Sequence, residues 1–457
     1  MAAGGRPRGY SLTLGACPTR LDAVNRSFTG SAHTLSRMTA ANLSPTNIFD
    51  RQAQVEELYA KCTFGSGVLF LVVEIAYFGA WKHASLSVPT WDAIDAVIGR
   101  DFLNIWMGGR AALAGGPAAW FDADTYNAVI RGLLEPNPLN DYRYYWSYPP
   151  DIVLFTWPFG LMPFFVAYVA WCLFGLVAFV AVAHAGGVER RNLLFVALAP
   201  AVMVTVFFGQ NGLVTAALLV GALTALNRRP VLAGLLLGIL TIKPQLGILL
   251  PVMLVLTGRW RTIATAGATV VVLVVVTAAL YGADVWVEYL RKVGTQQAWL
   301  LDHAGGNLVP SALYASRELG LSVSVAWTAQ AIESAFAIGA VVWTFYRRRD
   351  DVLSLCLFVT AIFLFTPYSY CYDMAVLAWV AALLRQRNDN APIDHYLILF
   401  VWTLPVTMML VGVTLHIPLG IIILPAFAGR LLWRLARTPA TSQSCIRRSA
   451  SILFAHP

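Results

Sequence analysis

The chain has 457 residues, of which 58% are hydrophobic and only 12% are charged. This composition excludes a water-soluble globular domain and is typical of a protein that crosses a membrane many times. The net charge of +8 does not indicate nucleic-acid binding. The basic residues gather in short loops and at both tails, where they fix the orientation of a membrane protein.

The N-terminal part of the chain differs from the rest. Residues 1–61 are polar and contain no apolar stretch of the kind found in a cleavable signal peptide. We expect them to form a cytoplasmic, unstructured tail, with translation starting at Met1 or at Met38. An apolar domain of about 10–13 transmembrane helices follows over residues 62–433. Residues 434–457 then form a second cytoplasmic tail.

The first large loop, residues 82–150, contains an amphipathic segment at 99–115. Phe102, Ile105 and Trp106 fall on one helical face. We expect this helix to lie on the membrane surface with its apolar side in the lipid. Asp101 opens the helix, and its carboxylate is either an N-cap or a general base at the membrane surface. The two roles are compatible.

The end of this loop is rich in aromatic residues. Residues 142–150 include Arg143 and Tyr148, and they indicate either an interfacial aromatic belt or contacts to a sugar and a phosphate. Residues 151–161 are apolar but follow two prolines and end near Pro163. We interpret them as a partial, re-entrant helix buried in protein, because lipid does not tolerate such a segment in the open.

Two later breaks between apolar segments are polar. Gly209-Gln210-Asn211-Gly212 is a tight turn or a set of ligand contacts. Lys243 and Gln245 flank a proline, and a lysine in an apolar region either faces a partner such as a phosphate or reaches out to the interface. With a cytoplasmic N-terminus, the positive-inside rule places both breaks, the 82–150 loop, the 282–322 loop and residues 366–373 on the extracytoplasmic face.

The remaining candidates are less specific. His303 lies in the second large loop, where a solvated histidine is the usual alternative to a functional one, and Tyr370 precedes an apolar segment. The six cysteines show no metal-ligand spacing. No phosphate-binding glycine loop or other nucleotide motif occurs. We therefore predict no metal site and no cofactor.

Taken in order, these motifs resemble glycosyltransferase family 87 of the GT-C superfamily, which includes polyprenyl-phosphate-mannose-dependent mannosyltransferases. The resemblance is carried by Asp101–Gly115, Tyr148-Pro149-Pro150, Pro158 to Trp171, Gly209-Gln210-Asn211, Lys243-Pro244-Gln245 and Arg259-Trp260-Arg261. It implies an all-α GT-C fold with an extracytoplasmic site and a polyprenyl-phosphate sugar as donor. It also implies that Asp101 is the catalytic base. The chain departs from the family at residues 368–373, where a histidine is expected.

The resulting hypothesis is a bacterial plasma-membrane enzyme that transfers a hexosyl unit to a hydroxyl of a lipid or glycan. Its partners are the donor, the acceptor and membrane lipid, with no nucleic acid. Asp101 removes the acceptor proton. The expected donor contacts are Lys243, Arg110, Arg143, Gln210, Asn211 and Gln245. The expected acceptor or sugar contacts are Tyr148, Trp106, His303 and Tyr370. The alternatives are a transporter or lipid flippase and a non-catalytic assembly factor.

Overall fold

The computed structural model describes residues 45–79, 99–133, 144–303, 308–347 and 351–437. The chain divides into two compact units, Met1–Leu58 and Tyr59–Pro457. The described part of the first unit is the beginning of helix α2 (Pro45–Gly79). This helix therefore starts within the segment expected to be an unstructured tail. Every regular element of the described residues is helical.

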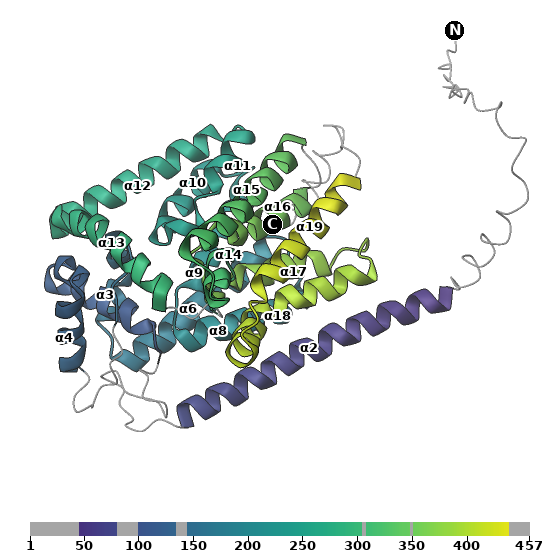
Figure 1. The fold of residues 1–457 in the computed structure, drawn as a ribbon, viewed down its shortest axis with the longest axis horizontal. Helices are drawn as coiled ribbons and strands as arrows, with labels where there is room; N and C mark the ends of the chain where they lie inside the picture. Colours follow the sequence, from purple (N-terminus) through teal and green to yellow (C-terminus); the bar gives the residue numbers. More distant parts are fainter. Residues whose placement is uncertain (1–44, 80–98, 134–143, 304–307, 348–350, 438–457) are drawn as a thin grey trace, which may run out of the picture. The chain divides into compact units, whose positions relative to one another are not determined.

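The second unit is a succession of helices, many of them short (Figure 1). After α2 the α-helices are α3 (Phe102–Ala114), α4 (Ala123–Leu133), α5 (Val153–Gly160), α6 (Phe164–Ala185), α7 (Leu193–Ala197), α8 (Pro200–Phe208), α9 (Gly212–Ala225), α10 (Pro230–Ile239), α11 (Leu250–Leu256), α12 (Trp260–Tyr281), α13 (Asp284–His303), α14 (Ala312–Glu318), α15 (Val323–Arg347), α16 (Asp351–Phe365), α17 (Ala375–Arg385), α18 (Pro392–Leu415) and α19 (Gly420–Arg437). Short 3₁₀ turns include η1 (Ala118–Phe121), η2 (Pro150–Ile152), η4 (Leu240–Ile242), η5 (Pro244–Leu246) and η7 (Cys371–Met374).

Five of the described helices are long and apolar enough to cross a membrane, and a sixth span results if the bent pair α7 and α8 counts as one. The five spans lie in α2, α6, α12, α15 and α18. Four shorter apolar segments are Gly212–Ala225, Pro230–Ile242, Pro244–Leu256 and Val352–Phe365. The chain is thus an all-helical, multi-pass membrane protein. The expected count of about 10–13 spans depends on the shorter helices as well.

Helix α3 is buried against protein, which corrects the expectation that its apolar side lies in lipid. Phe102, Ile105 and Trp106 are almost completely inaccessible. Phe102 and Trp106 both contact the ring of Phe164, with ring centroids 5.5 and 5.3 Å apart. The amphipathic pattern was read correctly as a helix, but the apolar face packs on neighbouring helices rather than on the bilayer.

The partner of α3 is the short helix α5, which follows η2 where the partial helix over 151–161 was expected. Gly109 and Gly160 allow the two backbones to touch. A Cβ atom on Gly109 would lie 2.6 Å from the backbone nitrogen of Gly160. Small residues permit such close helix crossings in membrane proteins. This crossing fixes the position of α3, and therefore of the residue that precedes it.

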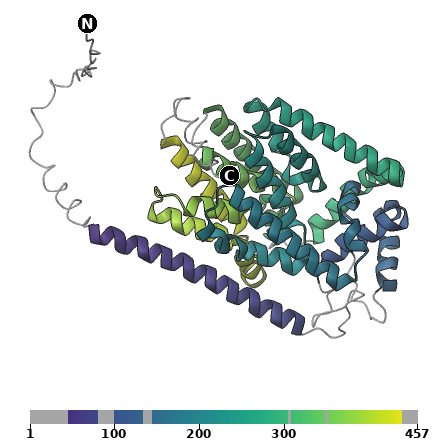
Figure 2. The same cartoon turned by 180° about the vertical axis from the view of Figure 1, so that it is seen from behind.

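Helix α17 lies at the centre of the unit, with Ala375 through Leu384 all buried. The 3₁₀ turn η7 leads into it and contacts both α8 and α9. Three breaks between elements are therefore held near one another: the α8–α9 turn, the start of α17, and the η4–η5 break, which contacts α9. Figure 2 shows the same helices from behind. These ends position the polar side chains of the candidate site.

Candidate active site

Asp101 immediately precedes α3, but its carboxylate does not cap the helix. The residue occupies the N-cap position without a side-chain capping hydrogen bond. Instead, its Oδ2 atom accepts a hydrogen bond from Gln210 Nε2 at 2.8 Å. The side chain keeps partial exposure. Of the two roles considered for Asp101, the structure leaves its carboxylate available for chemistry rather than committed to the helix end.

The turn between α8 and α9 packs directly on the backbone beside Asp101. Gly209 adopts φ +62°, and a Cβ atom there would lie 2.8 Å from the carbonyl oxygen of Gly99. At the other end of the turn, a Cβ atom on Gly212 would collide with the carbonyl oxygen of Tyr372. Both glycines are needed because backbone approaches backbone on each side. The turn therefore connects the Asp101 loop with the segment that leads into α17.

Gln210 is buried between these elements, with 8% of its surface exposed. Its Oε1 atom accepts hydrogen bonds from the hydroxyl of Tyr148 at 2.9 Å and from the backbone N–H of Asn211 at 3.3 Å. The indole of Trp171 donates to its backbone carbonyl at 3.3 Å. Gln210 thus links Tyr148 to Asp101.

Lys243 lies at the break between η4 and η5 and points into the same cluster. Its ammonium donates to Asn211 Oδ1 at 2.9 Å and forms an ion pair with Asp373. It also lies 4.8 Å from the centre of the Tyr372 ring. Only 5% of Lys243 is exposed, so it does not reach out to an interface. The structure therefore excludes the reading in which this lysine reaches the interface, and its contact to a phosphate stays a prediction.

Asp373 is the counter-charge of Lys243 and is itself fully buried. Its second oxygen accepts a hydrogen bond from the backbone N–H of Tyr370 at 3.0 Å. The rings of Tyr370 and Tyr372 stack with centroids 5.2 Å apart. The hydroxyl of Thr205 holds the carbonyl of Tyr372 at 2.9 Å. Hydrogen bonds and ring stacking therefore fix residues 370–373 beside Lys243.

The electrostatics of the cluster depend on burial. Burial raises the pKa of Asp101 above its usual value, while the hydrogen bond from Gln210 and the charges of Lys243 and Arg100 oppose that rise. Burial, and then the charge of Asp101, raises the pKa of the Tyr148 phenol. Tyr148 therefore remains a protonated hydrogen-bond donor at physiological pH.

The structure brings Asp101, Tyr148, Gln210, Asn211 and Lys243 into one connected network, in which Tyr370 takes part through its backbone and ring. Three other candidates take no part in these bonds. Trp106 is a core residue whose indole donates to the carbonyl of Met162 at 3.0 Å. Arg110 is exposed and lies 4.8 Å from the Trp106 ring. Gln245 is half-buried in η5.

Two candidates cannot be placed. Arg143 lies outside the described residues. His303 is the last residue of α13, and its side chain is also outside the described part. Among the described residues, no group of three or more His, Cys, Asp or Glu side chains could hold a metal ion.

Sequence reasoning assigned no functional role to two buried acids near the cluster. Asp373 stands at the start of an apolar segment, where an acid suits a helix cap, and its side chain does accept from the backbone N–H of Tyr370, but its pairing with Lys243 was not predicted. The sequence could have indicated this pair. A lysine in an apolar region needs a counter-charge, and Asp373 is one of the few acids beside an apolar segment. Asp151, directly after the Tyr148-Pro149-Pro150 motif, is 2% exposed, and its Oδ1 atom has no partner among the described residues. Burial raises the pKa of Asp151 to about 6.

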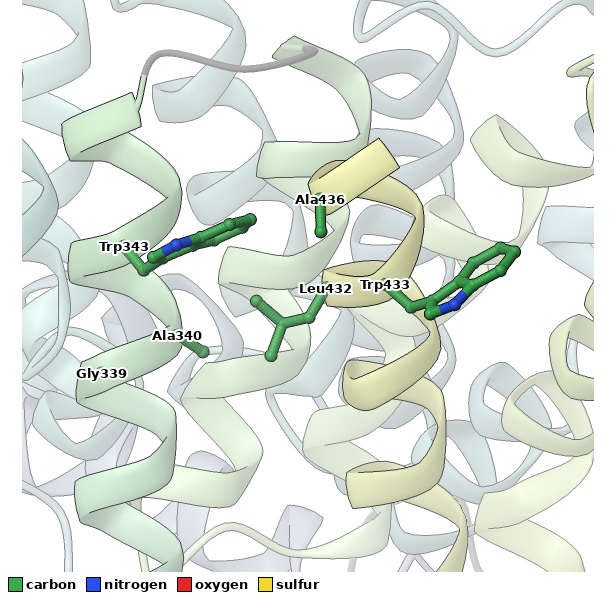
Figure 3. Close-up of a pocket in the computed structure, with 6 residues that line it drawn as sticks. All are labelled: Gly339, Ala340, Trp343, Leu432, Trp433 and Ala436. Carbon is green, nitrogen blue, oxygen red and sulfur yellow. The ribbon is translucent and has the colours of Figure 1, made fainter. Parts of the chain in front are cut away.

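A separate apolar groove of about 390 Å³ lies between α15 and α19 (Figure 3). It is lined by Gly339, Ala340, Trp343, Leu432, Trp433 and Ala436. Arg430 and Arg437 lie 4.1 and 4.0 Å from the Trp433 ring. None of these residues belongs to the polar network, so the groove is not part of the candidate active site.

The fold and the buried network of acids, amides and a lysine define a multi-pass membrane protein with an enzyme-like polar site. The chain contains a glycosyltransferase family 87 domain over residues 146–367, and it is therefore a membrane glycosyltransferase. The matched region includes Tyr148, Gln210, Asn211 and Lys243, while Asp101 precedes it. Comparisons with curated proteins and with solved structures gave no match.

Proposed function

We propose that the enzyme transfers a hexosyl unit, such as mannosyl, from a polyprenyl-phosphate carrier to a hydroxyl of a lipid or glycan acceptor. The reaction takes place on the extracytoplasmic face of a bacterial plasma membrane. The observation that supports it best is the carboxylate of Asp101, which is free of its helix and hydrogen-bonded to Gln210 in a family 87 protein. The distribution of basic loops supports this orientation.

In the proposed reaction, the ionised carboxylate of Asp101 accepts the proton of the acceptor hydroxyl. The acceptor oxygen attacks the anomeric carbon, and a new glycosidic bond forms. The bond between that carbon and the phosphate oxygen breaks, and its electron pair leaves with the polyprenyl phosphate. A single displacement of this kind inverts the anomeric centre. A general base that keeps partial exposure, so that an acceptor hydroxyl can reach it, suits this step.

The charge on the leaving phosphate must be met by nearby cations, which is the electrostatic contribution we expect to be largest. Lys243 is the buried cation of the network, and two of its three N–H groups point at Asn211 and Asp373. We assign its third N–H to the phosphate, with Arg110 or Arg143 supplying the remaining positive charge.

Other polar groups are proposed to bind the sugar or the acceptor. The Asn211 Nδ2 atom is fully buried without a partner in the described part of the chain, so it is a donor available to a sugar or phosphate oxygen. Tyr148 and Tyr370 border the network, and their aromatic rings suit a sugar face. Gln245 and His303 complete the predicted contact set.

The test is sugar transfer by the purified protein. The donor is polyprenyl-phosphate mannose with a radiolabelled sugar. A lipid extract of the host supplies the acceptors. Wild type is compared with Asp101→Asn, which keeps the side-chain shape but cannot accept the proton. Asp284→Asn is the matched control, because Asp284 is an exposed acid at the start of α13.

Label entering a product with wild type and Asp284→Asn, but not with Asp101→Asn, supports both the reaction and the base. Normal transfer by a well-folded Asp101→Asn protein would reject the base. An absence of transfer from every polyprenyl-phosphate sugar tested would reject this class of donor. Transport or flipping of lipid-linked sugar would then be assayed in vesicles.

A further inference from the structure

The side-chain amide of Gln210 lies between two groups of the candidate site. Its Nε2 atom donates to Asp101 Oδ2 at 2.8 Å, and its Oε1 atom accepts from the Tyr148 hydroxyl at 2.9 Å. Its backbone is also fixed, because Gln210 N–H donates to the carbonyl of Thr205 at 3.1 Å. The side-chain oxygen and nitrogen of Gln210 and its backbone N–H therefore each have a partner within the protein.

The orientation of the amide is set by its surroundings. An amide oxygen and nitrogen have nearly the same shape, so their assignment must follow from their partners. The backbone N–H of Asn211 is only a donor and faces one end of the amide at 3.3 Å. That end must be Oε1, and the N–H₂ end must face Asp101. The Tyr148 hydroxyl adds a second donor to the same end.

The consequence for Asp101 is asymmetric. One carboxylate oxygen, Oδ2, is engaged by a neutral donor that favours the ionised form of the acid. The other oxygen makes no hydrogen bond to a side chain of the network. A general base needs one oxygen directed at the proton it accepts, and its orientation must be held within a narrow range.

We propose that Gln210 is a positioning residue for Asp101: its amide, locked by Tyr148 and Asn211, holds one carboxylate oxygen so that the other faces the acceptor hydroxyl. This inference rests on the proposed role of Asp101 as the base. It gives Gln210 a different role from the direct sugar or phosphate contact expected from the sequence.

The test uses Gln210→Met, which keeps the length and volume of the side chain but removes the amide. We expect kcat to fall about 10- to 100-fold, the effect of losing a hydrogen bond to a charged group, with little change in KM for donor and acceptor. The acidic limb of the kcat profile should move to higher pH, because the lost hydrogen bond favoured the ionised carboxylate. Gln54→Met, at an exposed position of α2, is the control.

Tyr148→Phe is the second variant, because it removes one of the two hydrogen bonds to Gln210 Oε1 and leaves the amide in place. We expect a smaller fall in kcat and a shift of the acidic limb in the same direction. This variant carries the test if Gln210→Met does not fold. An unchanged kcat and pH profile in the folded variants, alongside an inactive Asp101→Asn, would overturn the role of Gln210 alone. An active Asp101→Asn would instead overturn the proposed base on which it rests.

Discussion

Asp101 is hydrogen-bonded to the turn at 209–212, and Asp373 is linked to the same turn through Lys243, yet the surroundings of the two acids differ. Asp101 is partly exposed, and its only side-chain hydrogen bond within the network comes from a neutral amide. Asp373 is 1% exposed, and its two oxygens accept from the ammonium of Lys243 and from the backbone N–H of Tyr370. The turn at 209–212 contributes Gln210 to the first acid and Asn211 to the partner of the second.

This difference separates a chemical role from a structural one. The charge of Asp373 is compensated by a buried cation, and both of its oxygens are engaged. Removing one member of such a pair leaves an uncompensated charge in a region of low dielectric constant. Asp101 is instead hydrogen-bonded to the neutral amide of Gln210, and its other oxygen makes no hydrogen bond to a side chain of the network, so it is the acid of this pair suited to accept a proton.

The largest expected effect comes from exchanging the two acids for their amides. Asp101→Asn should lower transfer by about 10²- to 10⁴-fold, the usual contribution of a general base, without lowering the thermal unfolding temperature. Asp373→Asn should mainly lower the unfolding temperature, because it leaves the buried charge of Lys243 without its partner. Transfer rates and thermal unfolding of both variants check this comparison. Equal losses of activity and stability in the two variants would contradict it.

The second prediction concerns the ion pair itself. Lys243→Met and Asp373→Asn should each destabilise the protein by about 3–5 kcal/mol, because each leaves a buried charge unpaired. The double variant should be destabilised by less than the sum, since both charges are then absent. Thermal unfolding of the four proteins measures the coupling. Simple additivity would show that the two side chains do not depend on each other.

How far the sequence anticipates this site can be judged from particular residues. Asp101, Gln210, Asn211 and Lys243 were singled out because each interrupts or begins an apolar segment, and the structure joins them in one network. Polar residues at helix ends have few alternatives in a membrane protein other than water, a headgroup or one another. For these residues, the local pattern together with the predicted topology was enough to group them, and their roles stay predictions.

Other features depend on contacts that no local pattern contains. The spacing of apolar residues in α3 predicts a helix. It does not say whether the apolar face packs on lipid or on protein, because both are apolar. Its burial follows from the approach of Gly109 to Gly160, which are far apart in sequence. For the same reason Trp106 was expected at the site and lies in the core. The pairing of Lys243 with Asp373 likewise joins residues separated by 130 positions.

The third prediction tests whether the position of Asp101 depends on the turn. Gly209→Ala should destabilise the protein by about 2–4 kcal/mol, from backbone strain and overpacking together. It should also reduce transfer, because the added methyl group pushes on the backbone at Gly99. Gly258→Ala is the matched control, with φ +66° but no atom within 4 Å of the added Cβ.

The control separates the two causes, since Gly258→Ala carries the same left-handed backbone without the crowding. Transfer and thermal unfolding are measured for both variants. We expect Gly258→Ala to lose about 1–2 kcal/mol of stability and no activity. If the two variants lose activity equally, the packing of the turn on the Asp101 loop is not what holds the base.

The smallest expected effect concerns Asp151, which contrasts with Asp373 because no described cation pairs with it. Burial raises the pKa of Asp151 to about 6, so the folded protein binds a proton that the unfolded chain has already released above about pH 4. Stability from this group is therefore present at low pH and is lost as the pH rises through about 6. Asp151→Asn should remove about 1–2 kcal/mol of this pH dependence.

Unfolding temperatures between about pH 4.5 and 7.5 check this expectation, within the range where ordinary acids are already ionised. Wild type should lose stability across this range relative to Asp151→Asn, and the variant should be the more stable protein at the upper end. Asp284→Asn, at an exposed position, should follow the wild-type curve. Parallel curves for wild type and Asp151→Asn would mean that Asp151 is compensated by a group outside the described residues. The contrast with Asp373 would then disappear, because both acids would have a compensating charge.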